Sequence, residues 1–234
     1  MGTSVLDQFI PPGDSHENLL VIFGGGGHGK SMIETIMAHN RYKIVGFVDE
    51  GMAPGGQVLG YTCLGGASVL PELIARGITL ATNGVGGIGS VGTRVKVFDL
   101  LLSAGFSLPP IWHPSAVIEP SAVLEDGVQI MPLSYIGGDA VIGFGSVINI
   151  SACAPHDSKI GRVANLSPHA VLAGNVTVGD HTQIGMSATV NLGITIGTRV
   201  RIGNSAVVKA DVPDDTIVYA GTIWPTPKWQ QQTG

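Results

Sequence analysis

The sequence predicts two units of different class: a small α/β unit, followed by an all-β unit folded as a parallel β-helix. Two patterns support this. The second half carries an apolar side chain at every sixth position, and the first half begins with a buried strand, a glycine-rich turn and a helix. The 234 residues are enough for two modest domains.

The six-residue repeat runs from Ile118 to Val208, and fifteen of its sixteen apolar positions are branched aliphatics. A period of six fits neither an α-helix nor a single alternating strand. It fits a parallel β-helix in which each hexad is one short strand and turn, and three hexads form a triangular coil. The run predicts about five coils, roughly 25 Å long at about 4.8 Å per coil. Glycines that follow the aliphatic residue, such as Gly143 and Gly161, are expected at corners where φ is positive or the backbone is crowded.

The first half predicts a strand at Leu19–Phe23, a glycine loop at Gly24–Gly29, a helix at Ser31–His39 and a second strand at Tyr42–Val48. This order implies a parallel sheet. Further elements are expected as a helix at 68–76, a strand at 78–81 and a helix at 93–104. The expected domains are a leader at 1–17, a nucleotide-binding unit at 18–110, the β-helix at 111–213 and a tail at 214–234.

The glycine loop matches the dinucleotide-binding motif G-x-G-x-x-G at Gly24, Gly26 and Gly29. Asp49 lies twenty residues after Gly29, where a ribose-binding acid would sit. About ninety residues precede the repeat, which is few for a complete two-half domain of that kind. We therefore interpret this part as a truncated Rossmann-like unit that binds a nucleotide diphosphate without consuming it.

The same loop also matches the P-loop motif, through Gly24, Gly29, Lys30 and Ser31. Both motifs direct backbone N–H groups at a helix N-terminus toward a phosphate. Three alternatives stay open at this point: NTP hydrolysis, hydride transfer, and a tight turn that needs glycines only for its shape.

The composition of the chain excludes several classes of binding partner and of binding site. The net charge is -5 and there is no basic cluster, which argues against nucleic acid. Cys63 and Cys153 do not suggest a disulfide framework or a zinc site. No apolar stretch reaches membrane-spanning length and the start lacks a signal-peptide pattern, so we expect a soluble, cytoplasmic protein.

One position in the repeat, Ala154, is not a branched aliphatic, and Pro155, His156 and Asp157 follow it. A small residue and a proline predict a local deformation of the coil. His156 occupies the third place of its hexad, which should project outward. A histidine beside a carboxylate is a candidate general base, with Asp157 orienting the ring or supporting the imidazolium. The alternative is a solvated surface histidine.

Two further histidines, His169 and His181, lie in the repeat. Histidines that bind zinc between the subunits of trimeric β-helices usually include a pair five residues apart. The spacings here from His156 are thirteen and twelve, so no metal site is expected.

The chain resembles the bacterial nucleotide-sugar acyltransferases from about Leu19 to Gly221. This family comprises N-acetyltransferases of UDP- or GDP-linked 4-amino-dideoxysugars together with sialic acid O-acetyltransferases. The matching stretches are 21–29, 45–49, 112–116, 155–161 and 172–176. The resemblance implies a left-handed β-helix of hexapeptide repeats and a homotrimer with active sites between subunits.

The resemblance also implies roles for particular residues. His156 would deprotonate the acceptor amine or hydroxyl, with Asp157 beside it. The backbone N–H of Gly174, with Ala173 adjacent, would hold the thioester oxygen of acetyl-CoA, whose pantetheine would lie along the later coils. The sugar nucleotide would bind through its phosphates at the glycine loop and through its nucleoside near Asp49. The loop residues implied are Gly24, Gly26, Gly27, His28 and Gly29.

Two departures from the family pattern bear on the acceptor and on the coenzyme. Many relatives have His-x-Ser-Pro-Gly-Ala where this chain has Asn165 and His169 at the first and fifth of those places. The tail at 219–225 also differs, so coenzyme contacts there are not carried over.

The activity that the resemblance implies is acetyl-CoA-dependent N-acetylation of a nucleotide-linked amino-dideoxysugar. The amine would attack the thioester directly in a ternary complex, without a metal. Two alternatives stay open: O-acetylation of the sialic acid type, and a non-catalytic, nucleotide-binding trimeric scaffold.

Overall fold

The computed structural model describes residue 6 and residues 18–87, 89 and 91–227, so the expected leader lies outside the described residues except at Leu6. The chain forms two compact units. One comprises Met1–Gly86 and Gly92–Pro109, and the other comprises Gly87–Val91 and Pro110–Gly234. No helix among the described residues is long and apolar enough to cross a membrane.

The first unit is built on a five-stranded sheet in the order β3-β4-β2-β1-β5. The strands are β1 (Leu19–Phe23), β2 (Lys43–Val48), β3 (Gln57–Val58), β4 (Tyr61–Gly65) and β5 (Leu80–Asn83). Strand β1 runs parallel to both β2 and β5, while β3 and β4 form an antiparallel hairpin. Strand β1, which lies between β2 and β5, is almost completely buried, as expected for a parallel strand covered on both faces.

The helices of this unit are α1 (Gly27–His39), α2 (Leu70–Ala75), preceded by the 3₁₀ turn η2 (Ala67–Val69), and α3 (Val91–Ser103). Helix α1 buries Met32, Ile33 and Ile36. It begins at Gly27 rather than at the predicted Ser31. The predicted start was too late, because glycine disfavours a helix by about 0.5–1 kcal/mol. Here Gly24 adopts positive φ, Gly26 caps the helix, and Gly27 and Gly29 are helical.

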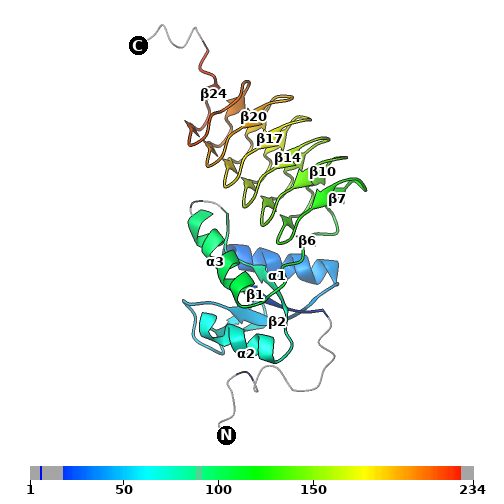
Figure 1. Ribbon diagram of the computed structural model, residues 1–234, viewed down its shortest axis with the longest axis vertical. Helices are drawn as coiled ribbons and strands as arrows, with labels where there is room; N and C mark the ends of the chain where they lie inside the picture. The colour runs from blue at the N-terminus through cyan, green and yellow to red at the C-terminus, as the bar shows by residue number, and fades with distance from the viewer. Residues whose placement is uncertain (1–5, 7–17, 88, 90, 228–234) are drawn as a thin grey trace. The chain divides into compact units, whose positions relative to one another are not determined.

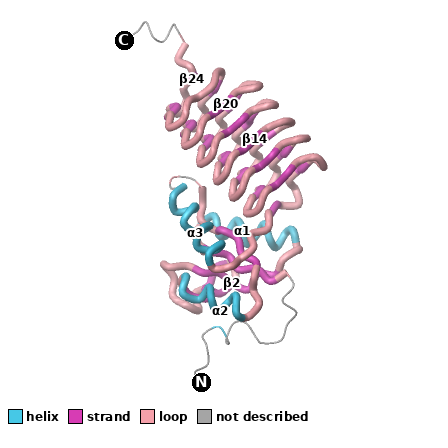
Figure 2. Tube along the Cα trace, in the orientation of Figure 1, coloured by secondary structure: helices cyan, strands magenta, loops and turns pink. Residues whose placement is uncertain are grey.

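The second unit is a parallel β-helix made of three sheets, visible as a stack of coils in Figure 1. The first sheet has the order β24-β22-β19-β16-β13-β10-β7, the second β20-β17-β14-β11-β8 and the third β23-β21-β18-β15-β12-β9-β6. Each strand is two residues long and pairs with the strand one coil away, so Ile136 lies beside Ile118 and Ala154. Figure 2 shows these short strands separated by corner turns.

The strands of the β-helix share a length of two residues. They are β6 (Ile111–Trp112), β7 (Val117–Ile118), β8 (Val123–Leu124), β9 (Gln129–Ile130), β10 (Tyr135–Ile136), β11 (Val141–Ile142), β12 (Val147–Ile148), β13 (Cys153–Ala154), β14 (Lys159–Ile160), β15 (Asn165–Leu166), β16 (Val171–Leu172), β17 (Thr177–Val178), β18 (Gln183–Ile184), β19 (Thr189–Val190), β20 (Thr195–Ile196), β21 (Arg201–Ile202), β22 (Val207–Val208), β23 (Ile217–Val218) and β24 (Ile223–Trp224).

The repeated aliphatic residues point inward and form one continuous core. Fully burying such a side chain contributes about 1.5–3 kcal/mol, so the stacked column supplies most of the stability of this unit. The prediction that three hexads form one coil is confirmed by the pairing of residues eighteen apart, as between Ile142 and Ile160.

Ala154 is also buried in this column, and it keeps the register of Ile136, so the predicted deformation of the coil was wrong. The structure shows only a local change in strand pairing. On the side toward β16 only Cys153 is paired with Val171, because Pro155 has no N–H to donate to the next coil.

Positive φ at the corners is carried mainly by residues other than glycine, such as Asp139, Asp157 and Asn175. The glycines that follow the aliphatic residues serve the other expected purpose, close backbone approach. A Cβ on Gly143 would lie 2.7 Å from the carbonyl oxygen of Ile160, and a Cβ on Gly161 would lie 2.7 Å from the nitrogen of Asp180. Only glycine fits at these positions.

The stacking continues beyond residue 213, where the sequence pattern places the start of a tail. Strand β23 pairs with β21, and β24 pairs with β22. In this last coil Arg201 lies beside Ile217, sixteen residues away instead of eighteen. Counting in steps of six therefore no longer reaches the inward-facing positions in this coil, although the β-helix continues.

Candidate functional site

His156 lies at the corner between β13 and β14, and its side chain is 65% exposed. Its Nδ1 lies 2.8 Å from Oδ2 of Asp157, whose backbone adopts a left-handed φ of 61°. An ionised carboxylate can only accept a hydrogen bond, so Nδ1–H donates and Nε2 keeps its lone pair. A ring held in this way can take a proton through Nε2, which is the chemistry of a general base.

Gly174 occupies the equivalent corner one coil later, and the imidazole of His156 lies against its backbone. A Cβ on Gly174 would lie 2.3 Å from Cε1 and 2.4 Å from Nε2 of His156. On the preceding coil, a Cβ on Gly138 would approach only the Oγ of Ser121 within 4 Å. The ring therefore leans toward the later coil, with its Cε1–Nε2 edge against Gly174.

The backbone N–H of Gly174 differs from those at the same hexad place on another corner. There, the N–H groups of Phe144, Arg162 and Thr198 donate to the carboxylates of Glu125, Asp180 and Asp214 respectively. Within the residues that the structure describes, the N–H of Gly174 has no acceptor. An uncapped donor beside a base is the pairing that acyl transfer requires, since one accepts a proton while the other stabilises a developing oxyanion. Ala173 is not equivalent, because its N–H donates to the carbonyl of Val190.

A second candidate region is the glycine loop of the first unit. Gly24 has φ 107°, and a Cβ on Gly29 would lie 2.1 Å from the carbonyl oxygen of Gly24, so both positions require glycine. Gly26 and Gly27 are exposed where α1 begins, and His28, on the first turn, is half-buried.

Asp49 follows β2 and contacts this loop. One carboxylate oxygen accepts the N–H of Gly25 at 2.8 Å, and the other accepts the N–H of Gly51 at 2.8 Å. The predicted acid is therefore at the loop, as the motif requires, and it also holds the loop backbone in place.

The structure disfavours the P-loop interpretation. Lys30 and Ser31 are the fourth and fifth residues of α1, and Lys30 is exposed. Its N–H donates to the carbonyl of Gly26 as part of the helix, and so does not face a ligand. The short turn leading directly into a helix is the dinucleotide-binding geometry.

The two remaining histidines lie at different corners. His169 follows β15 and His181 follows β17, and both adopt positive φ. Asn165 is buried on the third sheet and donates to the Oγ of Ser167 at 3.0 Å. Among the described residues, no group of three or more His, Cys, Asp and Glu side chains is arranged to hold a metal ion.

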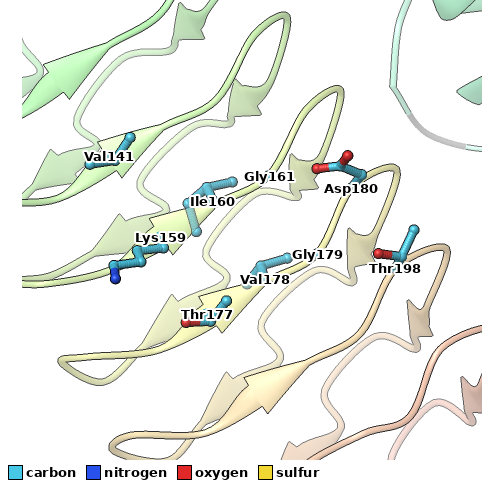
Figure 3. Close-up of a pocket in the computed structure, with 9 residues that line it drawn as sticks. All are labelled: Val141, Lys159, Ile160, Gly161, Thr177, Val178, Gly179, Asp180 and Thr198. Atoms are coloured by element: carbon cyan, nitrogen blue, oxygen red, sulfur yellow. The ribbon is translucent and has the colours of Figure 1, made fainter.

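A hollow of about 390 Å³ lies on the second sheet (Figure 3), and no pattern in the sequence predicted it. Lys159, which begins the strand after the His156 corner, lines it together with Thr177, and Asp180 and Thr198 line it from the next corner. Its volume falls in the range of small-molecule sites.

Three comparisons with known proteins bear on the identity of the chain. Residues 19–101 match the family described as the PglD N-terminal domain. A structure of perosamine N-acetyltransferase from Caulobacter crescentus was solved with one histidine replaced by asparagine and with CoA and GDP-perosamine bound. It has a TM-score of 0.81 and 35% identity, covering 86% of this chain and 93% of that chain. The acetyltransferase domain of PglB from Neisseria gonorrhoeae, solved with acetyl coenzyme A, has a TM-score of 0.78 and 28% identity, covering 88% of this chain and 98% of that chain.

Two further proteins are similar, one over most of its length and one over about a third. WeeI from Acinetobacter baumannii shares the fold, with a TM-score of 0.75 at 23% identity over 86% of this chain and 96% of that chain. The acyl-[acyl-carrier-protein]–UDP-N-acetylglucosamine O-acyltransferase of Saccharophagus degradans is 32% identical over 93 residues, which are 35% of this chain and 36% of that protein. The chain thus spans about a third of the length of that relative.

The predictions of fold and family are confirmed by these likenesses. The identity of 35% extends over 93% of the perosamine enzyme, and the TM-score of 0.81 shows that the two chains share their fold. The chain therefore belongs to the bacterial sugar acetyltransferases of the hexapeptide-repeat superfamily, which are acyltransferases built on a left-handed parallel β-helix.

Proposed function

We propose that the protein is an acetyl-CoA-dependent N-acetyltransferase that acetylates the amino group of a nucleotide-linked amino-dideoxysugar. The observation that carries this is the position of the His156 ring against Gly174, whose backbone N–H has no acceptor among the described residues. Support also comes from the relative with 35% identity that was solved with both CoA and GDP-perosamine.

In the proposed mechanism the acceptor amine attacks the carbonyl carbon of the thioester. Nε2 of His156 takes the proton that the amine loses, while Asp157 holds the opposite ring nitrogen through its 2.8 Å hydrogen bond. The N–H of Gly174 donates to the carbonyl oxygen as negative charge develops on it. The C–N bond forms, the C–S bond breaks, and the proton held by His156 protonates the departing thiolate.

A direct attack agrees with the state of Cys153, the described cysteine nearest His156 in the chain. Its side chain is half-buried on the first sheet, and burial raises the pKa of its thiol. Raising this pKa reduces the thiolate fraction that a nucleophile needs. We therefore assign no covalent acyl-enzyme step to this chain.

The glycine loop is proposed to bind the sugar nucleotide. Gly24, Gly26, Gly27, His28 and Gly29 would surround its phosphates at the start of α1, where backbone N–H groups and the helix dipole favour anions. Asp49 would lie near the nucleoside, since it borders the same loop.

A homotrimer with active sites between subunits is proposed from the surface of the first sheet. Val117, Tyr135 and Val171 are exposed along this sheet, and Leu133 and Leu192 are exposed at its corners. A contiguous apolar surface of this kind is typical of subunit interfaces. A cytoplasmic location, where acetyl-CoA is made, belongs to the same proposal.

Replacing Val171 by aspartate is expected to dissociate the trimer, because the charge would be buried without a partner in the interface. Sedimentation equilibrium would measure the mass of the assembly. Gln183→Asp, which adds the same charge on the third sheet, is the matched control and should leave the mass unchanged. Equal masses for the two variants would place the interface elsewhere.

The test of the function is calorimetric titration with acetyl-CoA and then with UDP-, GDP- and dTDP-linked amino sugars, followed by mass spectrometry of the mixture. We expect saturable binding of acetyl-CoA and of one sugar nucleotide, and a product that has gained one acetyl group. An amide product resists mild alkaline hydroxylamine, whereas the ester from O-acetylation does not. Nucleotide-sugar binding without any response to CoA would overturn the proposal and favour a scaffold.

A further inference from the structure

The first unit carries a second glycine loop, Gly84–Gly86, directly after β5. The chain passes from β1 outward to β2 and β4 and then returns to β5 on the other side of β1. Open α/β sheets bind ligands outside the carboxyl ends of their strands at the point of such a reversal. That point lies between β1 and β5, whose ends carry Gly24 and Gly84.

The two glycine loops touch backbone to backbone. The N–H of Gly84 donates to the carbonyl of Phe23 at 2.7 Å, and a Cβ on Gly84 would lie 2.5 Å from the carbonyl oxygen of Gly24. Further along, a Cβ on Gly86 would lie 3.5 Å from the Cβ of His28. The second loop therefore borders the residues that form the proposed phosphate site.

The peptide groups on both sides of Val85 are fixed by buried polar side chains. Its N–H donates to Oδ1 of Asn83 at 3.0 Å, and its carbonyl accepts from Nη1 of Arg94 at 2.6 Å. The Nδ2 of Asn83 donates in turn to the carbonyl of Arg94 at 2.9 Å, which joins the two side chains into one network.

Arg94 is an unusual residue for its place, because it is only 1% exposed on α3. Its guanidinium lies over the ring of Phe98, 4.9 Å from the centroid, and burial lowers its pKa. Burying a charge is costly unless hydrogen bonds compensate it. An apolar residue would suit the packing at lower cost, so the hydrogen bond to the loop is what distinguishes arginine here.

We propose that the loop Gly84–Gly86 forms the second wall of the nucleotide site and that Arg94, with Asn83, is the positioning residue that holds it there. This inference rests on the proposed function. The ligand class is a nucleoside diphosphate, whose phosphates would lie between the two glycine loops. Arg94 acts through the carbonyl of Val85 and does not touch the ligand.

The test compares Arg94→Met, Arg94→Lys and Gly86→Ala with the unaltered protein by calorimetry against GDP, UDP, their amino-sugar conjugates and acetyl-CoA. Losing a hydrogen bond to a charged group should weaken nucleotide binding by about 10–100-fold in Arg94→Met. We expect KM for the sugar nucleotide to rise by a similar factor, while kcat and the affinity for acetyl-CoA stay unchanged. Arg94→Lys should recover part of the affinity, because it keeps the charge without the planar donor fork.

Gly86→Ala keeps the test decisive if Arg94→Met does not fold. The added methyl would meet only ordinary contact with His28, so the fold should be retained while the wall of the site is filled. Nucleotide affinity should fall by about tenfold. Arg76→Met, which removes a surface ion pair with Glu72 in the same unit, is the matched control and should bind normally.

The outcomes separate the two proposals. If the unaltered protein binds none of the nucleotides, the proposed function fails and this inference fails with it. If the unaltered protein binds and Gly86→Ala binds equally well, the second wall is overturned while the proposed function stands. If Gly86→Ala binds weakly and folded Arg94→Met binds normally, the role assigned to Arg94 is overturned.

Discussion

Replacing His156 by alanine is expected to lower the turnover of acetyl transfer by about 10²–10⁴-fold, the usual contribution of a general base. The ring is 65% exposed and its one described side-chain partner is Asp157, so its removal should cost little stability. The proton of the attacking amine would then pass to water, which is a weaker base. Steady-state kinetics with acetyl-CoA and the sugar nucleotide would measure the loss, with KM values close to those of the unaltered protein.

The matched control is His181→Ala, because His181 is another histidine at a corner of the same β-helix. It should retain full turnover. Asp157→Asn should fall between the two, since an amide can still contact the ring but does not stabilise the imidazolium as a carboxylate does. Unchanged turnover in His156→Ala would remove this residue from the mechanism.

Replacing Gly174 by alanine is expected to lower turnover by about 10²-fold without unfolding the protein. The new Cβ would lie 2.3 Å from Cε1 of His156, so the ring must move away from its position against Gly174. A displacement of about 1 Å at a reacting group is sufficient for a loss of that size. Because the atoms that clash belong to an exposed side chain, the ring can move into solvent and the fold should tolerate the change.

Gly137→Ala is the comparison variant, in which the added Cβ would clash with backbone atoms instead of a side chain. There the added Cβ would lie 2.3 Å from the backbone nitrogen of His156 and 2.5 Å from the carbonyl carbon of Pro155, neither of which can rotate away. We expect a loss of about 1–3 kcal/mol in the free energy of unfolding, as for an overpacked core. Chemical denaturation of both variants, together with turnover, would test the distinction. A Gly174→Ala protein as active as the unaltered one would contradict the assignment of its N–H.

The sequence predicted most of the β-helix because its core requires one inward aliphatic side chain per hexad, and that requirement is visible at each position from Ile118 to Val208. It missed the last coil because Arg201 and Ile217 are sixteen residues apart there, so counting in sixes no longer reaches the inward positions. It also missed the hairpin of β3 and β4, whose turn uses Leu59 at φ 47° before Gly60 instead of a recognisable Asn-Gly pair.

The candidate site, like the fold, was predicted from the sequence only in part. A coil of eighteen residues places position 174 next to position 156, but the role of Gly174 was implied only by the family resemblance. The direction in which the ring leans was not predicted, because it depends on the hydrogen bond to Asp157. The network of Asn83 and Arg94 gave no signal, since an arginine in a short amphipathic helix is usually exposed.

Each coil of the β-helix is held mainly by the coil before it and the coil after it. A duplication or loss of one whole coil therefore returns every later side chain to its own face, whereas a change of one residue within a strand turns the aliphatic column outward. The length of this half of the chain is therefore expected to change by whole coils. The coil at the end has sixteen residues instead of eighteen, and its strands still pair in register, so the difference in length is taken up at the corners. The corners are therefore where insertions and deletions can accumulate without disturbing the aliphatic column.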